Sequence, residues 1–540
     1  MAYIELKNVT FSYPDTAQPA IRSLSLKIEK GQFVVLFGSS GSGKSTLLRL
    51  LKKEIQPHGK LSGEIRINGE VLQESNAIGF VFQDPENQIV ADEVLHELVF
   101  GLENSGIGIN EMRSRVAEMV HYFGADELLQ QKMQELSGGK KQLINLASVL
   151  LMQPDILLLD EPTSQLDPVS ARELLDLLLR LNEEFGMTIV LAEHRLEELS
   201  ALADKMVLLE GGEAIYEGDP REVLPQLWST PYSDYIPSIP ALFFKLDGHG
   251  TVPLTVKEGR SWLRPLYSQL KSAKTPKEET GEVFLQIKEA YFRYHSHKSF
   301  VLDELDFRLN QGEIYALMGG NGSGKSTLLK IACGIIKPEH GKVLLANKPF
   351  KSWKKHDLLQ RIGYLPQNPK LFFLHDTVEK EIEATMQQWG LSDRGEIERL
   401  LERLDIAGLR NSHPYDLSGG ELQKAAIACL LMRKPDLLLL DEPTKGLDPV
   451  SKKALASILT GLKRAGMTVL LSTHDIEFAA QYATRCGMMF QGRISSEDVP
   501  ERFFNGNFFY TTMVQRLLRP FFDHRVLTVG EEVPRCRPNE

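Results

Sequence analysis

Two glycine-rich stretches of the sequence combine the residue types that bind phosphate. Residues 38–45 and 319–326 both fit the pattern G-x-x-x-x-G-K-[ST]. The glycines let consecutive backbone N–H groups converge on phosphate oxygens, and the lysine brings a positive charge to the β and γ oxygens of a nucleotide. The hydroxyl that follows the lysine is placed to hold Mg²⁺. The expected nucleotide-binding residues are Gly38, Ser39, Ser40, Gly41, Ser42, Gly43, Lys44, Ser45 and Thr46 in the first stretch and Gly319, Gly320, Asn321, Gly322, Ser323, Gly324, Lys325, Ser326 and Thr327 in the second.

Each glycine-rich stretch lies between a strand-like run and a helix-like run. Apolar residues of β type fill 33–37 and 314–318, directly before the glycines, and a leucine-rich helical pattern follows each lysine. This order of strand, loop and helix is the context that a phosphate-binding loop requires. We therefore predict a phosphate site at the start of a helix in both places.

The two stretches belong to a long internal repeat. Lys44 and Lys325 are 281 residues apart. The same interval, within one residue, separates three further pairs: Ser137 and Ser418, Asp160 and Asp441, and His194 and His474. A repeat of this kind has to be recognised first because it decides how the fold is interpreted. The sequence predicts two homologous ATPase halves in one chain.

A pair of carboxylates ends a continuous apolar run in each half. Asp160-Glu161 follows residues 156–159, and Asp441-Glu442 follows residues 437–440. Such a run is typical of a fully buried parallel strand, and ligands bind at the carboxyl ends of these strands in open α/β sheets. A solvated strand end with a helix-capping acid explains one carboxylate but is a poor explanation for a repeated pair. We predict that these acids take part in the chemistry.

Three further repeated features are weak alone and gain weight together. A glutamine, Gln83 or Gln367, ends a short strand, where a turn residue is the ordinary interpretation. Leu-Ser-Gly-Gly opens a helical pattern in both halves, although any helix can begin with a capping serine. A histidine follows the next strand, where most histidines are structural. The residues concerned are Gln83, Ser137, Gly139 and His194, with Gln367, Ser418, Gly420 and His474.

An aromatic residue occupies matching places near the start of each half. Tyr13 and Tyr294 both follow alternating residues that predict edge strands of a small antiparallel sheet. Their rings are candidates to stack on adenine. The alternative, a half-buried strand tyrosine, is the better explanation for either residue taken alone.

Composition excludes several classes of protein. The 540 residues are 42% hydrophobic and 25% charged, which is ordinary for a globular protein, and the formal net charge is −10 without a long basic run. We therefore expect no nucleic-acid partner. Four cysteines without C-x-x-C spacing predict reduced thiols and no zinc or iron–sulfur site. The first residues lack a signal pattern and no apolar stretch approaches ~18 residues, which predicts a chain neither secreted nor membrane-spanning.

The phosphate loop, the glutamine, Leu-Ser-Gly-Gly, the acidic pair and the histidine occur in this order in both halves. With these five features the chain resembles the ATP-binding-cassette (ABC) ATPases over about residues 3–220 and 283–498. The resemblance implies an α/β fold of two tandem P-loop ATPase domains, each with a mainly parallel sheet core, a small antiparallel β subdomain and a helical subdomain. We expect the first domain at 1–225, a post-domain segment and linker at 226–281, the second domain at 282–498 and a tail at 499–540. The halves would pair head to tail, with each ATP between one phosphate loop and the other half's Leu-Ser-Gly-Gly.

The resemblance also implies roles for the site residues. Glu161 and Glu442 would polarise the attacking water, and His194 and His474 would hold the γ-phosphate. ATP and Mg²⁺ are the expected ligands, and the metal would be held by Ser45, Gln83 and Asp160 in one site and by Ser326, Gln367 and Asp441 in the other. Asp167 and Asp448 would communicate between the two paired halves. In this family glutamine most often follows Leu-Ser-Gly-Gly, the signature segment, but Lys140 and Glu421 stand there in this chain. Equal ATP turnover at the two sites is therefore not assured. We nevertheless predict two competent sites.

A narrower resemblance comes from residues 83–88, 97–104 and 193–198, which are similar to the ATPases of energy-coupling-factor vitamin and metal importers. It implies an ATP-hydrolysing motor bound peripherally at the cytoplasmic face of the cell membrane. The partners would be an integral membrane scaffold subunit and a small substrate-binding membrane subunit. The substrate would be a vitamin or vitamin precursor, such as a thiamine-related compound, or a metal ion. The alternative for these stretches is ordinary surface loops and helices.

A different class of function stays open. Tandem cassettes also occur in soluble translation factors that act on the ribosome, and these are expected to carry a long, highly charged helical linker. The stretch from Ser229 to Pro265 is instead dotted with prolines and aromatic residues, and the charged stretch after it is short. The sequence therefore favours the transport interpretation over a ribosomal one.

Overall fold

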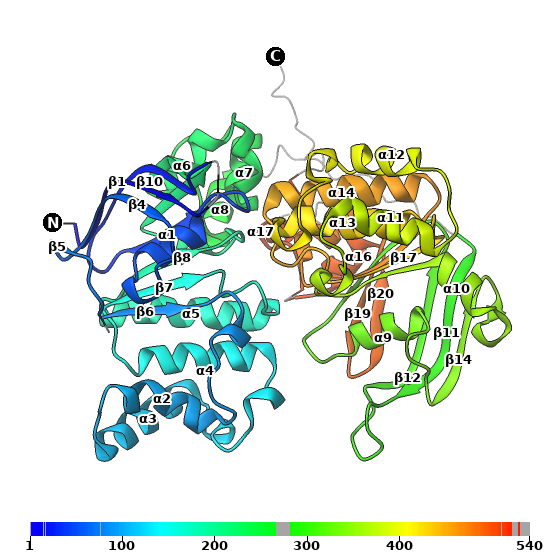
Figure 1. Ribbon diagram of the computed structural model, residues 1–540, viewed down its shortest axis with the longest axis horizontal. Coiled ribbons are helices and arrows are strands. Elements are labelled where there is room, and N and C mark those ends of the chain that lie inside the picture. Colours follow the sequence, from blue (N-terminus) through cyan, green and yellow to red (C-terminus); the bar gives the residue numbers. More distant parts are fainter. Residues whose placement is uncertain are drawn as a thin grey trace. The chain divides into compact units, whose positions relative to one another are not determined.

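The computed structural model describes residues 2–14, 16, 18–75, 77–265, 281–508, 510–520 and 528–529. The chain packs as two compact units, Met1–Thr255 and Val256–Glu540. Figure 1 shows that each unit contains a sheet with helices packed against it. The units are considered separately below.

The core of the first unit is a sheet whose described strands run in the order β10, β9, β3, β8, β7, β6. All neighbours pair in parallel except β10 and β9, which pair antiparallel. Every residue of β3, β7 and β8 is buried, as predicted from their continuous apolar runs. The strands are β3 (Phe33–Phe37), β6 (Ile78–Val81), β7 (Ile156–Asp160), β8 (Thr188–Ala192), β9 (Lys205–Glu210) and β10 (Glu213–Gly218).

A smaller antiparallel sheet precedes this core, with the order β2, β1, β4, β5. Its strands are β1 (Ile4–Ser12), β2 (Ile21–Ile28), β4 (Lys60–Ile67) and β5 (Glu70–Val71). The expectation that the first residues form edge strands is wrong for β1, because β4 pairs with it on the side opposite β2. A register shift between Leu6 and Val9 keeps both side chains buried.

Helices surround the core sheet, and a separate group of helices lies beyond it (Figure 1). In that group α2 and α3 pack on α4 around buried residues such as Val94, Leu98 and Val116. The helices are α1 (Lys44–Leu50), α2 (Val94–Asn104), α3 (Ile109–Phe123), α4 (Gly138–Leu150) and α5 (Pro168–Phe185). Short 3-10 turns lie at Lys53–Ile55, Pro85–Asn87, Asp126–Leu128, Met133–Glu135 and Leu199–Ala201.

Helical structure continues after the last strand of the first unit. Helix α6 (Pro220–Leu227), a 3-10 turn at Pro231–Tyr235 and α7 (Ser238–Lys245) follow in sequence. The carboxylate of Glu197 accepts hydrogen bonds from the Ser238 N–H at 3.0 Å and from the Ser238 hydroxyl at 2.6 Å. This link ties the start of α7 to the segment that follows β8.

The second unit repeats both sheets with the same strand order. The antiparallel sheet contains β11 (Val283–Phe292), β12 (Leu302–Asn310), β14 (His340–Leu345) and β15 (Lys348–Pro349). The core sheet contains β13 (Ile314–Met318), β16 (Ile362–Leu365), β17 (Leu437–Asp441), β18 (Thr468–Ser472), β19 (Arg485–Phe490) and β20 (Arg493–Asp498). The internal repeat is therefore a repeat of the fold.

Most helices of the second unit have a counterpart in the first, but the helix at Lys355–Arg361 has none among the described residues, and the helix at Ile476–Tyr482 stands where the first unit has the 3-10 turn Leu199–Ala201. The helices of the second unit are α9 (Lys325–Ala332), α10 (Lys355–Arg361), α11 (Val378–Gln388), α12 (Gly395–Arg403), α13 (Gly419–Leu431), α14 (Pro449–Arg464), α15 (Ile476–Tyr482), α16 (Pro500–Gly506) and α17 (Met513–Leu518). Helix α8 (Val256–Leu263) packs on α17, where Arg260 donates to the carbonyl of Arg516 at 2.5 Å. Further 3-10 turns lie at Phe350–Ser352, Pro369–Phe372, Ala407–Leu409 and Pro414–Asp416.

The carboxylate of Glu477 accepts a hydrogen bond from the N–H of Met513, the first residue of α17, at 2.9 Å. This contact corresponds to the one between Glu197 and Ser238 in the first unit.

Within the described parts of the chain, none of the helices combines the length and the apolar character that crossing a membrane demands.

Candidate functional site

The first phosphate-binding loop connects β3 to α1 and holds its lysine over its own backbone. The Nζ atom of Lys44 donates to the carbonyl oxygens of Gly38 at 3.0 Å and Ser39 at 2.8 Å. Gly38 has a φ of 142°, and a Cβ there would lie 2.0 Å from the carbonyl oxygen of Leu209. Only glycine fits between the loop and β9, which fixes how closely the backbone curls around the lysine.

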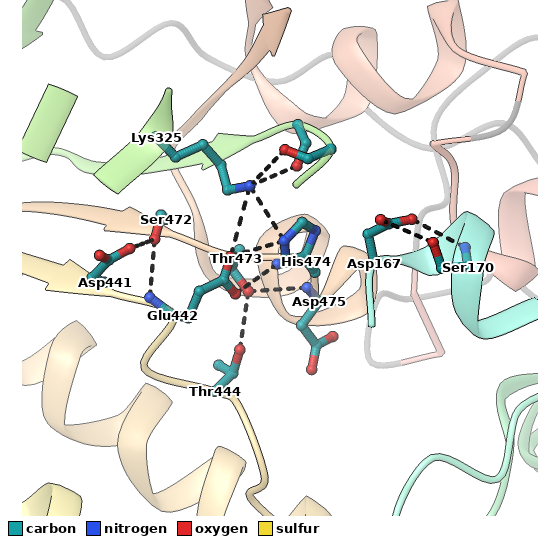
Figure 2. A network of polar contacts seen from close by, with 12 residues as sticks. Asp167, Ser170, Lys325, Asp441, Glu442, Thr444, Ser472, Thr473, His474 and Asp475 are labelled. Carbon is teal, nitrogen blue, oxygen red and sulfur yellow. Dashed lines mark hydrogen bonds and ion pairs between the residues drawn. The ribbon is translucent and has the colours of Figure 1, made fainter. Parts of the chain in front are cut away.

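The second loop, between β13 and α9, repeats this arrangement and adds two contacts. Lys325 Nζ donates to the carbonyl oxygens of Gly319 at 2.7 Å and Gly320 at 3.1 Å. It also lies 3.2 Å from Nε2 of His474 and 4.0 Å from a carboxylate oxygen of Glu442 (Figure 2). The cation of the second half is therefore within reach of both groups expected to act on the γ-phosphate.

At the end of β7, Asp160 is buried beside the first phosphate loop. It accepts a hydrogen bond from Ser45 Oγ at 2.8 Å. Burial raises the pKa of the Asp160 carboxyl to about 6, with a contribution from the neighbouring Glu161 charge, while the Ser45 hydrogen bond opposes the shift. A hydroxyl and a carboxylate thus meet at the mouth of the loop.

Glu161 is held by two side chains from other elements. One carboxylate oxygen lies 2.7 Å from Nε2 of His194, which follows β8, and the other accepts from Nε2 of Gln83 at 2.7 Å, which follows β6. The backbone of Glu161 has a φ of 44°. This left-handed conformation is costly for a side chain of this size and is concentrated at functional sites. Three of the predicted residues are therefore joined in one cluster.

The corresponding cluster of the second half is built somewhat differently (Figure 2). Glu442, with a φ of 52°, lies 3.1 Å from Nε2 of His474 and accepts from the His474 N–H at 3.2 Å. Ser472 donates to Asp441 at 2.7 Å and accepts from the Glu442 N–H at 2.9 Å. Alanine occupies the matching position 192 in the first half, so the aspartates of the two halves have different hydroxyl partners.

A buried carboxylate that the sequence analysis did not assign supports the first histidine. Glu193 is 2% exposed and accepts from the N–H groups of Thr163 at 3.0 Å and His194 at 2.9 Å, and from the Thr163 hydroxyl. In the second half, the hydroxyls of Thr444 and Thr473 meet at 2.9 Å instead. The signal in the sequence was the Pro-Thr turn after each acidic pair, but the partner across the sheet could not be read from it.

The Leu-Ser-Gly-Gly segments begin helices as predicted, and their capping differs. Ser137 caps α4 by accepting from the Lys140 N–H at 3.5 Å. Ser418 caps α13 and also donates its hydroxyl to the carboxylate of Glu421 at 2.7 Å. The hydrogen bonds of both serines lie within their own helix ends, so the structure does not join Ser137, Gly139, Ser418 or Gly420 to the acidic clusters of their own halves.

The two tyrosines are tethered to the phosphate-loop helices by their hydroxyls. Tyr13 contacts Thr46 Oγ1 at 3.1 Å, and Tyr294 contacts Thr327 Oγ1 at 3.2 Å. The Tyr294 side chain is half exposed. Gln367, the remaining predicted residue, follows β16 two residues after its end.

The oxygen donors at each loop suit a hard cation. A serine hydroxyl, an aspartate and a glutamine amide are ligands that Mg²⁺ accepts in company with phosphate oxygens and water. In the first half, the 2.8 Å contact between Ser45 and Asp160 shows that two of these donors already converge. Among the described residues, no group of three or more His, Cys, Asp and Glu could hold a metal ion unaided.

A comparison with family models identifies the family of the chain. The family model described as ABC transporter matches residues 21–164 and 302–445, more than half of the chain. The chain belongs to the ABC transporter family. It is a tandem ABC ATPase with two ATP-binding domains of α/β type.

Full-length relatives of this ABC ATPase carry names that assign them provisionally as ABC transporter ATP-binding proteins. One from Bacillus thuringiensis subsp. konkukian is 41% identical over 100% of this chain and 99% of the relative. One from Bacillus anthracis is 42% identical over 96% of each chain. Among solved structures, the CbiO1 protein of Clostridium perfringens, described as part of the ABC transporter complex CbiONQ, is 30% identical and covers 41% of this chain and 91% of its own, with a TM-score of 0.39.

Proposed function

We propose that this ABC ATPase is the motor subunit of a membrane importer of the energy-coupling-factor type, in which both halves bind and hydrolyse ATP. The observation that carries the proposal is a contact between glutamate and histidine in each half. Glu161 lies 2.7 Å from His194, and Glu442 lies 3.1 Å from His474. Neither half lacks a residue that hydrolysis needs. A chain whose two sites both turn over can drive a cycle of closing and reopening.

The residues of each site divide the chemistry between them. Lys44 or Lys325 neutralises the β and γ phosphates, which is the main requirement of phosphoryl transfer. Glu161 or Glu442 accepts a hydrogen bond from the attacking water and orients it. His194 or His474, already in contact with that carboxylate, donates to a γ-phosphate oxygen.

Mg²⁺ fits beside these residues. Ser45, Gln83 and Asp160, or Ser326, Gln367 and Asp441, would hold it, and it would offset the charge that develops between the β and γ phosphates. Asp160 would hold the ion in its ionised form; burial raises the pKa of this carboxyl to about 6, and the hydrogen bond from Ser45 opposes that rise.

The two halves work together as a head-to-tail pair in this proposal. Ser418 and Gly420 complete the ATP site of Lys44, and Ser137 and Gly139 complete the site of Lys325. The support is the position of both serines at the N-terminus of a helix, where backbone N–H groups and the helix dipole favour an anion. ATP binding closes the pair, and hydrolysis reopens it.

A membrane scaffold subunit docks on the loops that follow the two glutamines. Leu371 and Leu374 are 76% and 86% exposed, and Val90 is 64% exposed at the corresponding place of the first half. Large apolar side chains exposed together mark interaction surfaces. With such a partner, the protein lies at the cytoplasmic face of the cell membrane and carries a small substrate-binding membrane subunit beside the scaffold.

A buried glutamate fixes the backbone of each of these loops by hydrogen bonds. The buried carboxylate of Glu381 accepts from the N–H groups of Leu374 and His375, both at 2.8 Å. Glu97 accepts from Val90 at 2.9 Å and Ala91 at 2.7 Å in the same way. A loop fixed in advance loses little entropy when it binds a helix of the scaffold. The transported molecule is a vitamin, a vitamin precursor such as a thiamine-related compound, or a metal ion.

The test is stoichiometric co-purification from gently solubilised membranes with the tagged chain. Two polytopic membrane proteins, identified by mass spectrometry, are the expected partners. The double variant L371D/L374D is expected to lose them while the isolated protein still binds ATP. The control is Phe185→Asp, because Phe185 is 65% exposed at the end of α5, away from both loops in sequence. Ribosomal proteins without a membrane partner would overturn the proposal and leave a soluble ATPase acting on the ribosome.

A further inference from the structure

The two signature helices carry opposite charges at the same position. Lys140 and Glu421 both stand three residues after the capping serine, in the first turn of α4 and α13. In the proposed head-to-tail pair this turn faces the γ-phosphate of the other half's ATP. The phosphate that meets α4 finds an added positive charge, and the phosphate that meets α13 finds a negative one.

Glu421 does more than contribute a charge, because its carboxylate already occupies the donors of the helix end. One oxygen of Glu421 accepts from the Ser418 N–H at 2.9 Å and from the Ser418 hydroxyl at 2.7 Å. The Ser418 oxygen accepts in return from the Glu421 N–H at 3.4 Å. This reciprocal arrangement is a capping box, which satisfies helix-end donors that an anion could otherwise use.

At the start of α4, no carboxylate stands at the position of Glu421 to bind the hydroxyl of the capping serine, because Lys140 occupies that position. Ser137 is exposed and acts as an acceptor from the Lys140 N–H, and the Lys140 side chain is exposed as well. A lysine ammonium carries no acceptor, so it cannot occupy the N–H groups at the start of α4. An anion approaching α4 therefore has no carboxylate to displace from the capping serine.

We infer that the two ATP sites of this chain differ in affinity, and that Glu421 weakens the site of Lys44 while Lys140 strengthens the site of Lys325. To engage the γ-phosphate, Ser418 must first release its hydroxyl from Glu421, and the carboxylate must then stay close to a phosphate of the same sign. This inference rests on the proposed head-to-tail pairing. It adds an order of filling, with the site of Lys325 and Ser137 occupied at the lower ATP concentration.

The experiment measures occupancy of each half separately. The hydrolysis-deficient E161Q/E442Q protein is titrated with 8-azido-ATP and Mg²⁺, irradiated and digested, and the labelled peptides are assigned to the first or second half by mass spectrometry. The expected result is a half-saturating concentration about four- to twenty-fivefold higher for the first half, because each of the two opposite charges at a helix N-terminus changes binding by about two- to fivefold.

Two matched variants identify the residues responsible. Glu421→Gln keeps the capping geometry, since glutamine serves equally at that position, and removes only the charge. It is expected to lower the half-saturating concentration of the first half alone. Lys140→Gln is expected to raise that of the second half alone. Circular dichroism and thermal unfolding of both variants should match the parent protein.

Each contrary result has a distinct meaning. Equal labelling of the halves, with no response to Glu421→Gln, overturns the inference and leaves the proposed function intact. A response of the second half to Glu421→Gln overturns the head-to-tail pairing, and the inference with it. No specific labelling of either half overturns both the inference and the proposed ATP-driven function.

Discussion

Nε2 of His194 lies 2.7 Å from a carboxylate oxygen of Glu161, although 33 residues separate them in the sequence. They meet because β7 and β8 are parallel neighbours, so the residues that follow both strands emerge at the same edge of the sheet. The second half repeats the contact between His474 and Glu442 at 3.1 Å. The contact between glutamate and histidine is thus common to both halves, although the residues around it differ.

Replacing both glutamates removes hydrolysis but not binding. E161Q/E442Q keeps an amide of the same size, which accepts poorly from the attacking water, and we expect steady-state phosphate release to fall by about 100-fold or more. ATP should remain bound, because the phosphate loops are untouched. Retention of labelled ATP on a filter and phosphate release report the two effects separately. The control is Glu213→Gln on the exposed strand β10. Undiminished hydrolysis by the double variant would refute these roles.

Two adjacent glycines of the second phosphate loop are expected to respond very differently to alanine. At Gly319, with a φ of 145°, a Cβ would lie 2.3 Å from the carbonyl oxygen of Met489, so Gly319→Ala must move the loop. Gly320 has nothing within 4 Å of its Cβ position, and the first half carries Ser39 there. We expect G319A to abolish ATP binding at the second site and G320A to leave it nearly unchanged. Labelling of each half with an azido nucleotide measures this, and equal effects of both changes would contradict the account.

Arg485 compensates a buried carboxylate in the second unit. It donates to both oxygens of Glu313, at 2.8 Å and 3.2 Å, and burial raises the pKa of Glu313. Arg485→Met leaves that carboxylate uncompensated, and we expect a loss of about 3 kcal/mol in the free energy of unfolding. Arg493→Met, on an exposed pair with Asp303, is the control and should change little.

The same variant carries a predicted pH dependence. Because the pKa of Glu313 is raised in the folded state, its protonated form is favoured there, and stability is lost as pH rises through the folded-state pKa. Without Arg485 the pKa rises further, so R485M should be less stable relative to the parent protein at pH 7.5 than at pH 5. Denaturant unfolding at the two values measures the difference. A deficit that grows toward acid pH would show that Glu313 is not the cause.

The buried thiols are expected to resist alkylation. Burial raises the pKa of Cys333 to about 11 and raises the pKa values of Cys429 and Cys486 well above the usual range. At pH 8 only about one Cys333 in a thousand is then a thiolate, the form that reacts. In a Cys536→Ser background, we expect iodoacetamide to label these three cysteines slowly in the native protein and rapidly in denaturant. Mass spectrometry follows each thiol, and rapid native labelling of any of them would contradict the prediction.

The sequence predicted the features that local pattern determines. The apolar runs that became β7 and β17 are continuous, and the phosphate loops have fixed spacing, so strand, loop and acid pair could be placed in both halves. What pairs across the sheet could not be placed. The internal position of β1 depends on residues 60–67, and the support of His194 by Glu193 depends on Thr163, 30 residues earlier.

The capping box of α13 could have been predicted from the sequence. Ser418 and Glu421 have the S-x-x-E spacing of a capping box, which the first half lacks because Lys140 stands in place of the glutamate. The letters alone show a departure from the commonest signature. Only the hydrogen bonds of the Ser418 hydroxyl show that the carboxylate turns back onto the group expected to meet phosphate.

The carboxylates of Glu197 and Glu477 stand three residues after the two histidines, and each binds the first N–H of a helix beyond the last strand of its cassette. The two contacts use the same residue type at the same place in each half. The helix beyond the last strand is therefore part of the internal repeat, so the repeated unit extends past the segments 21–164 and 302–445 that match the family model.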